Sequence, residues 1–213
     1  MIFLNLSVFD VDKTIFTVNS SFKYYFFLVK KKVFPKRSFF KLLKIFFNFN
    51  FSPENLHKKV FFSFLKGKKE KDIFKYVDSF LEDILFYFLN EKVFSFLKLS
   101  KKRGDKILLI SNSPELLIEK IAKKLFIENY AATSYKNDKL GRLNDINYMM
   151  TGENKAKYVL KLANNLNISK DNIFLFTDSM WDYPLLKISG NIYVVNPNKR
   201  LKKIAEKNRW NIL

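Results

Sequence analysis

Two aspartates, Asp10 and Asp12, directly follow an apolar run at residues 2–9 that is typical of a buried strand. Carboxylates this close together repel each other, and partial burial strengthens the repulsion. The pair therefore indicates either a helix cap and turn or a site with a cation between the side chains. The sequence has no cysteine and one histidine, His57, which excludes thiolate and multi-histidine metal sites and most Ser-His or Cys-His catalysis. Oxygen ligands remain, and they favour ions such as Mg²⁺.

Further polar side chains follow other apolar runs in the same way. Buried strands are expected at residues 106–113, 172–179 and 191–195. Ser111 lies near the end of the first of these, Asp178 near the end of the second, and Asp182 four residues later. Ligands bind at the carboxyl ends of strands in an open parallel sheet, so we expect these side chains near the first two aspartates. Carboxylates there can bind Mg²⁺ or act as nucleophiles, and Ser111 with the amides of a following helix can bind phosphate oxygens.

A lysine can offset part of this negative charge. Lys155 lies at the start of an expected helix over residues 153–166, shortly after Gly152. A cation in the first turn of a helix opposes the helix macrodipole, so the placement is locally unfavourable and indicates a functional reason. Lys157 is the alternative in the same helix.

Helical patterns alternate with the expected strands. They cover residues 116–126, 153–166 and 199–208. Ser113, Pro114 and Glu115 are the residue types of an N-cap, a first helical position and a first-turn acid ahead of the first of these helices. Buried strands alternating with helices predict an α/β fold whose parallel sheet is covered on both faces.

The segment after the first strand differs in character. Residues 18–98 show helical periodicity and no clear buried strand. Within residues 39–51, Lys41, Lys44 and Asn48 form one narrow polar stripe on an otherwise apolar helix. An all-helical insertion is therefore expected to interrupt the α/β core. We expect the core at residues 1–17 and 92–213 and the helical insertion at residues 18–91.

The chain carries a net charge of +19, from 39 Lys and Arg against 20 Asp and Glu. Nucleic acid or an anionic membrane surface would suit such a charge. The excess is nearly all lysine, however, and 25 phenylalanines accompany it. Since Lys, Asn, Phe and Ile all have A/T-rich codons, drift in genome composition would produce the same bias. We do not expect a nucleic-acid partner, whereas peripheral contact with a membrane stays open, as does the oligomeric state.

The N-terminal segment lacks the basic n-region of a signal peptide, and Asp10 ends its apolar run early. Lysines interrupt every apolar stretch before it reaches the roughly 18 residues of a membrane-spanning helix. We therefore expect a cytoplasmic protein, with the inner face of the membrane as the one surface it could contact.

Four motifs in this order resemble those of the haloacid dehalogenase (HAD) superfamily, in particular its phosphoserine-phosphatase-like branch, subfamily IB. The matches are DVDKT at residues 10–14 for motif I, Ser111 in LLISNS for motif II, Lys155 in TGENKAKYV for motif III, and Asp178 with Asp182 in FTDSMWDYPLL for motif IV. The C-terminal segment VVNPNKRLKKIAEKNRW is also similar to that branch. The resemblance covers both ends of the chain. It implies a Rossmann-like parallel sheet flanked by helices, with the helical insertion as the C1 cap.

The resemblance implies a Mg²⁺-dependent phosphatase that hydrolyses a small-molecule phosphomonoester through an aspartyl-phosphate. Asp10 would be the nucleophile, and Asp12 the general acid and then the general base. Lys155 would neutralise charge on Asp10 and on the transferring phosphoryl group.

Binding roles follow from the same resemblance. The implied phosphate-binding residues are Thr14, which also orients the motif I loop, Ser111, Asn112 and Lys155. The implied Mg²⁺ ligands are Asp10, Asp12 through its backbone carbonyl, Asp178, and Asp182 directly or through water.

Three departures from the family pattern stand out. Lys13 occupies a position where glycine or another small residue is commonest, and Thr177 one where glycine is frequent. Residues 16–21 lack the acid with which phosphoserine phosphatases meet the substrate amine, which argues against phosphoserine as the substrate.

Two alternative functions stay open. The narrow basic stripe on an apolar helix suits an interfacial position, so a lipid phosphate at a membrane surface is one alternative substrate. The other is a basic module that binds nucleic acid or anionic lipid on a HAD scaffold.

Overall fold

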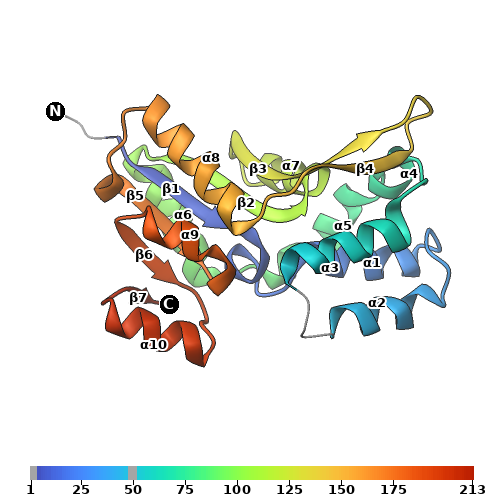
Figure 1. Ribbon diagram of the computed structural model, residues 1–213, viewed down its shortest axis with the longest axis horizontal. Coiled ribbons are helices and arrows are strands. Elements are labelled where there is room, and N and C mark those ends of the chain that lie inside the picture. Colours follow the sequence, from blue (N-terminus) through green and yellow to red (C-terminus); the bar gives the residue numbers. More distant parts are fainter. Residues whose placement is uncertain (1–3, 48–51) are drawn as a thin grey trace.

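The computed structural model describes residues 4–47 and 52–213, whose strands form one seven-stranded sheet in the order β4-β3-β2-β1-β5-β6-β7 (Figure 1). The strands are β1 (Leu6–Asp10), β2 (Lys106–Pro114), β3 (Asn129–Asn137), β4 (Leu143–Tyr148), β5 (Ile173–Thr177), β6 (Asn191–Val194) and β7 (Asn211–Ile212). All neighbouring pairs are parallel except β3 with β4. The predicted α/β fold with a parallel sheet is therefore confirmed.

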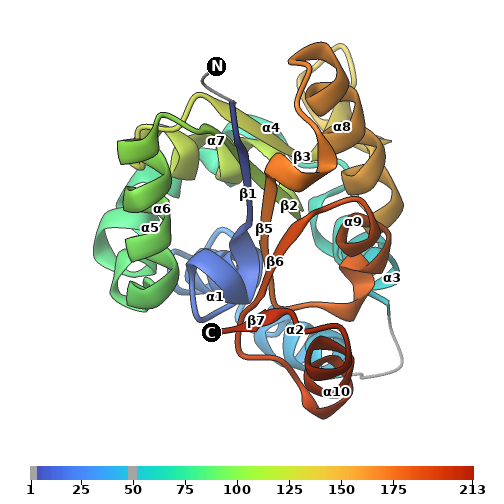
Figure 2. The ribbon, with the colours of Figure 1, turned by 90° about the vertical axis from the view of Figure 1, so that its left-hand side faces the viewer.

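Helices cover both faces of the sheet. The α-helices are α1 (Ser20–Lys30), α2 (Ser38–Phe46), α3 (Pro53–Val60), α4 (Glu70–Phe74), α5 (Val77–Asp83), α6 (Glu91–Arg103), α7 (Glu115–Lys124), α8 (Gly152–Asn165), α9 (Tyr183–Lys187) and α10 (Lys199–Lys207). Helices α6 and α7 lie on one face, and α8, α9 and α10 on the other (Figure 2). Alternation along β1 serves both layers, because Phe9 belongs to the first core and Val8 to the second.

The apolar runs that predicted strands correspond to β1, β2, β5 and β6. Residues 2 and 3 of the first predicted strand lie outside the described residues. Strands β3, β4 and β7 were not predicted. None of these three strands carries a long apolar run. The second half of β3 is polar and partly exposed, and β7 has only two residues. Strand β4 is the last strand of the sheet, pairs with β3 alone and is mostly exposed.

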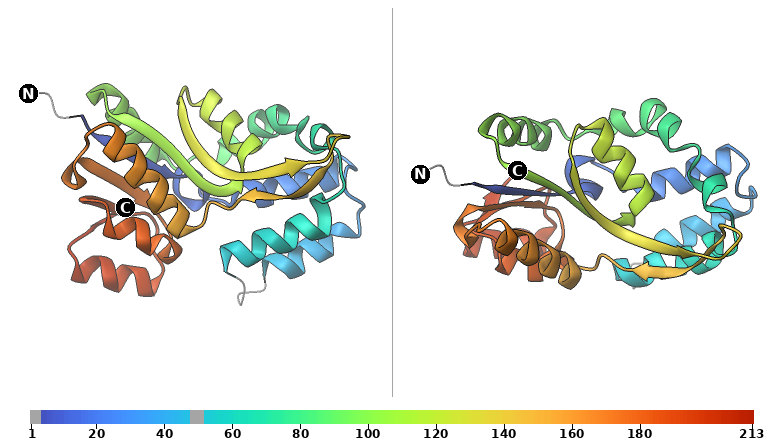
Figure 3. Two further views of the ribbon diagram at one scale, coloured as in Figure 1. Left: turned by 45° about the horizontal axis from the view of Figure 1, so that its top comes forward. Right: turned by 90° about the horizontal axis from the view of Figure 1, so that it is seen from above.

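Helices α1 to α5 occupy the chain between β1 and β2 and lie beyond the carboxyl ends of the central strands (Figure 3). The helix predicted within residues 39–51 is α2, where Leu42 and Ile45 are buried and Lys41 and Lys44 are exposed. Asn48 and the rest of that segment to residue 51 lie outside the described residues. The division into a core and a cap with boundaries at residues 17/18 and 91/92 stays a prediction. No helix in the described ranges is long and apolar enough to cross a bilayer.

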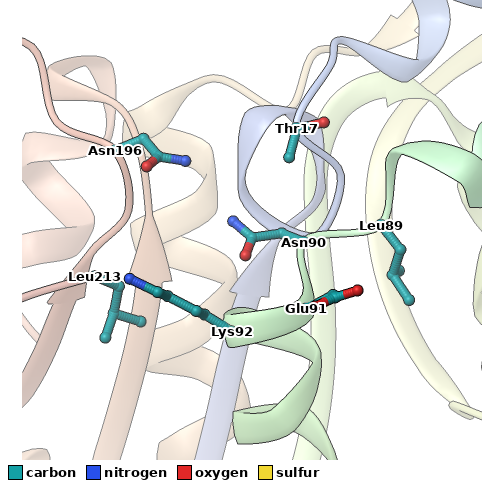
Figure 4. Close-up of a pocket in the computed structure, with 7 residues that line it drawn as sticks. All are labelled: Thr17, Leu89, Asn90, Glu91, Lys92, Asn196 and Leu213. Carbon is teal, nitrogen blue, oxygen red and sulfur yellow. The ribbon is translucent and has the colours of Figure 1, made fainter.

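The two connections between the core and these helices run side by side. The Thr17 amide donates to the carbonyl of Phe88 at 2.8 Å, and the Asn90 amide donates to the carbonyl of Ile15 at 2.8 Å. A cavity of about 250 Å³ lies next to them, with Thr17, Asn90, Lys92 and Leu213 around it (Figure 4). Backbone hydrogen bonds therefore fix the helical segment to the core a few residues after Asp10 and Asp12.

Candidate active site

A buried lysine joins two carboxylates at the carboxyl edge of the sheet. Lys155 Nζ lies 2.6 Å from Asp10 Oδ1 and 3.0 Å from Asp182 Oδ1. The three residues are between 2% and 5% exposed, whereas the alternative, Lys157, is exposed. Burial alone would lower the pKa of the Lys155 ammonium, but Asp10 and Asp182 raise it well above its usual range. Lys155 is therefore a fixed positive charge within hydrogen-bonding distance of both acids.

Close packing of two backbones places Lys155 there. Helix α8 begins at Gly152, and the Thr151 side chain caps it by accepting a hydrogen bond from the Asn154 amide at 3.3 Å. A Cβ atom on Gly152 would lie only 1.9 Å from the carbonyl oxygen of Trp181. The helix thus approaches the segment that carries Asp182 more closely than any residue with a side chain would allow.

Thr177, at the position where the family often has glycine, holds Asp182 in place. Its hydroxyl donates to Asp182 Oδ2 at 2.7 Å and accepts from the Ser179 amide at 3.2 Å. Thr177 ends β5 and is fully buried. The departure therefore adds a hydrogen bond to the buried acid.

The second aspartate of motif I is held by a different set of donors. Asp12 Oδ1 accepts from both the amide and the hydroxyl of Ser20, each at 2.6 Å. Asp12 Oδ2 accepts from the hydroxyls of Ser111 at 2.9 Å and Ser113 at 2.6 Å. Because Ser20 begins α1, the carboxylate lies at a helix N-terminus, where the macrodipole favours negative charge.

The predicted capping role of Ser113 is wrong. Helix α7 begins at Glu115 after Pro114, which provides no side-chain cap, and Ser113 still belongs to β2. Its hydroxyl contacts Asp12 instead. Ser20 was not predicted as a site residue either. The only sequence signal for it is its place in the Asn19-Ser20-Ser21 run, which is typical of a helix start.

Two predicted phosphate-binding residues contact other protein groups. Thr14 is fully buried and its hydroxyl donates to Asp10 Oδ2 at 3.4 Å. Asn112 Oδ1 accepts from the hydroxyl of Thr133, on β3, at 3.0 Å. Their direct contact with a phosphate stays a prediction.

Negative charge at this edge exceeds the positive charge beside it. Burial raises the pKa of Asp10. Lys155 acts to lower this pKa, whereas the neighbouring acids raise it further; these are Asp182, Asp178 and Asp12. Burial also raises the pKa of Asp178 to about 7, although Lys13 and Lys155 act to lower it. A further cation would stabilise the ionised form of both residues.

Mg²⁺ fits this donor set. Across the described ranges, no three His, Asp or Glu side chains are grouped as a ready metal site. Mg²⁺, however, is usually bound by only one or two carboxylates, with water and substrate oxygens completing its shell. Asp12 accepts four hydrogen bonds, and Asp182 Oδ2 accepts from both Lys155 and Thr177. Asp10 Oδ2 accepts only a long hydrogen bond, 3.4 Å, from the Thr14 hydroxyl, so Asp10 and Asp178 are the carboxylates best suited to an ion.

The backbone explains why glycine is common at the position of Lys13. Lys13 adopts φ 59°, in the left-handed region that glycine enters without steric cost. Its side chain is exposed, and its positive charge acts on Asp178. The chain thus accepts backbone strain at this turn and carries an additional cation there.

The family model of haloacid dehalogenase-like hydrolases matches residues 7–187, a range that includes every residue of the site. The chain belongs to the haloacid dehalogenase-like hydrolase family. The predicted HAD membership and the prediction of a hydrolase are thereby confirmed.

Named relatives of this HAD chain include phosphatases. The chain is 23% identical over 210 residues to a probable phosphatase of Mycobacterium tuberculosis, covering 96% of the chain and 73% of the relative. It is 22% identical over 219 residues to a histidinol-phosphatase of Neisseria meningitidis, covering 98% of each. A phosphoserine phosphatase crystal structure superimposes with a TM-score of 0.69 at 18% identity, covering 98% of this chain and 99% of that one, and shows the shared fold.

Gly152→Ala tests the packing that positions Lys155. The added methyl group would collide with backbone, so α8 must shift, and we expect the free energy of unfolding to fall by about 1–3 kcal/mol. Urea unfolding measures this change. The matched control is Glu153→Ala, one residue on and exposed, for which we expect a change within about 0.5 kcal/mol. Equal changes in the two variants would contradict the close approach.

Lys13→Gly tests the backbone strain. We expect the free energy of unfolding to rise by about 0.5–1 kcal/mol, because glycine removes the left-handed penalty but loses more chain entropy. Lys13→Ala removes the same charge without relieving the strain and should give no gain. If both variants gained equally in urea unfolding, charge rather than backbone conformation would be the cause.

Proposed function

We propose that the chain is a Mg²⁺-dependent phosphatase that hydrolyses a small-molecule phosphomonoester through a covalent aspartyl-phosphate on Asp10. The observation that carries this proposal is the buried Lys155 ammonium, 2.6 Å from Asp10 and 3.0 Å from Asp182. A fixed cation beside the buried Asp10 carboxylate opposes the rise in its pKa and stabilises the charge of an incoming phosphoryl group.

The two motif I aspartates divide the chemistry. Asp10 attacks phosphorus while the bond to the leaving oxygen breaks, and Asp12 gives its proton to that oxygen. Water then attacks the phosphorus of the aspartyl-phosphate, Asp12 takes the proton, and release of phosphate regenerates the Asp10 carboxylate. Support for these roles comes from the different environments of the two side chains, because only Asp10 contacts the lysine.

Hydroxyl groups around Asp12 provide for phosphate binding. In the described structure Ser111 donates to Asp12 Oδ2 at 2.9 Å, and Ser113 supports the same oxygen at 2.6 Å. We propose that the Ser111 hydroxyl turns to an oxygen of the bound phosphoryl group while Ser20 and Ser113 keep Asp12 in place. Thr14 and Asn112 then position the loops on which these groups lie.

Mg²⁺ would be held by Asp10 and Asp178, with the backbone carbonyl of Asp12 and with Asp182 through water. When bound, the ion would supply positive charge to the phosphoryl oxygens and reduce their repulsion of the Asp10 carboxylate. Burial raises the pKa of Asp178 to about 7 in spite of Lys13 and Lys155, and this supports the assignment, because a bound cation would offset the cost of burying the ionised carboxylate.

The proposed cap, residues 18–91 with helices α1 to α5, would select the substrate. The proposed core comprises residues 1–17 and 92–213. The names of the relatives, histidinol-phosphatase and phosphoserine phosphatase, support a small phosphate ester as substrate. The start of α1 carries no acid that could bind a substrate amine. Asn19 there caps the helix, and Ser20 binds Asp12. We therefore favour a phosphomonoester other than phosphoserine.

Asp10→Asn tests the covalent mechanism. We expect turnover of p-nitrophenyl phosphate with Mg²⁺ to fall by at least about 10³-fold, because the amide cannot form the phosphoryl-enzyme. Chelation of Mg²⁺ should silence the unmodified enzyme, and added Mg²⁺ should restore it. The control is Asp145→Asn, an exposed acid on β4, which should leave turnover unchanged. Normal turnover by Asp10→Asn would contradict the proposal.

A further inference from the structure

A cavity of about 480 Å³ lies within the helical segment, between the α1–α2 connection and the chain that follows α3. These two segments are at the end of the molecule away from β6 and β7 (Figure 1). Its lining includes four cationic residues, Arg37, Lys41, Lys66 and Lys68, all of them exposed, and no acidic residue. The cavity is therefore strongly basic and separate from the Asp10 site.

Aromatic side chains lie beside the cations in the lining of this basic cavity. The lining includes the buried side chains of Phe34 and Phe64, whose ring centroids are 5.8 Å apart. Lys41 Nζ lies 5.2 Å from the centroid of the Phe64 ring. Ser38 and Ser63 add hydroxyl groups to the lining. The lining of the cavity thus combines packed aromatic rings with cationic groups and hydroxyl groups.

None of the four cations forms an ion pair with an acid in the part of the chain that the structure describes. Within residues 4–47 and 52–213, none of them has a carboxylate within 4.0 Å, although other lysines, such as Lys120 and Lys124, pair with acids. Like charges around a concave, low-dielectric surface repel one another and focus a positive potential into it. An anion in the cavity would relieve this repulsion.

We propose that the basic cavity binds a phosphate group at a site distinct from the catalytic one. One guanidinium and three ammonium groups suit the charge and the oxygen acceptors of phosphate, and the two serine hydroxyls can donate further hydrogen bonds. The volume exceeds that of a single phosphate, so the group can be part of a larger molecule. This inference is independent of the chemistry at Asp10.

A free phosphate compound or a phospholipid headgroup could supply this group. Phe62 is 52% exposed and Lys66 lies over its ring at 5.3 Å, so an apolar side chain stands beside the cavity. Phe40, next to Lys41 in α2, is 74% exposed. These rings would meet acyl chains if the phosphate came from a lipid, and the test below separates the two sources.

Titration of the full chain with inorganic phosphate, without Mg²⁺ and followed by amide NMR, tests the site. We expect the amides of Ser38 and Ser63 to shift, separately from any shift at Ser111. In Lys41→Gln/Lys66→Gln the dissociation constant from these amides should rise at least about tenfold, since two charged contacts are lost. The matched control, Lys202→Gln/Lys203→Gln, removes two exposed lysines of α10 and should leave the constant unchanged.

A second arm identifies the source of the phosphate group. The full chain is sedimented with phosphatidylglycerol vesicles and, separately, with phosphatidylcholine vesicles. Binding to the phosphatidylglycerol vesicles alone, lost in Lys41→Gln/Lys66→Gln, shows a lipid source. Shifts with inorganic phosphate but no vesicle binding support the site with a free phosphate compound as its ligand. The proposal is overturned if neither probe binds, or if both lysine pairs affect binding equally, which would reveal diffuse surface charge. Because neither readout uses turnover, failure of the phosphatase proposal would not affect it.

Discussion

The contact between the Lys155 ammonium and the Asp10 carboxylate is the interaction on which the rest of the site depends. A buried ion pair adds little stability compared with apolar side chains of the same size, but an unpaired buried charge is costly. The chain therefore has to keep both partners together, and several local features serve this requirement. Gly152 lets α8 approach the Asp182 segment, and Thr177 fixes Asp182 as the second acceptor.

Asp12, only two residues from Asp10, is stabilised by neutral donors instead. Its donors come from the start of α1, through Ser20, and from the end of β2, through Ser111 and Ser113. The proposed proton carrier is thus bound by the helical segment and the sheet together. Movement of α1 relative to the sheet would change the hydrogen bonds of Asp12, which couples the position of the proposed cap to the acid–base step.

Local signals in the sequence predicted much of this arrangement. Apolar runs mark the central strands, and polar residues at their ends meet because parallel strands share one carboxyl edge. The unfavourable place of Lys155 in its helix indicated a functional reason for the residue. Ser113 was misassigned because hydroxyl residues suit both caps and ligands, and its bond to Asp12 joins residues 101 positions apart. The preference for glycine at Lys13 became intelligible only from its φ of 59°.

The central claim is that Lys155 compensates two buried carboxylates, and the free energy of unfolding of Lys155→Met tests it most directly. We expect urea unfolding at pH 7.5 without Mg²⁺ to show a loss of about 3–5 kcal/mol. This loss should shrink as pH falls, because protonation then neutralises the acids in the folded state. The exposed neighbour variant Lys157→Met should change by less than about 0.5 kcal/mol. A loss below about 1 kcal/mol in Lys155→Met, or one independent of pH, would contradict the claim.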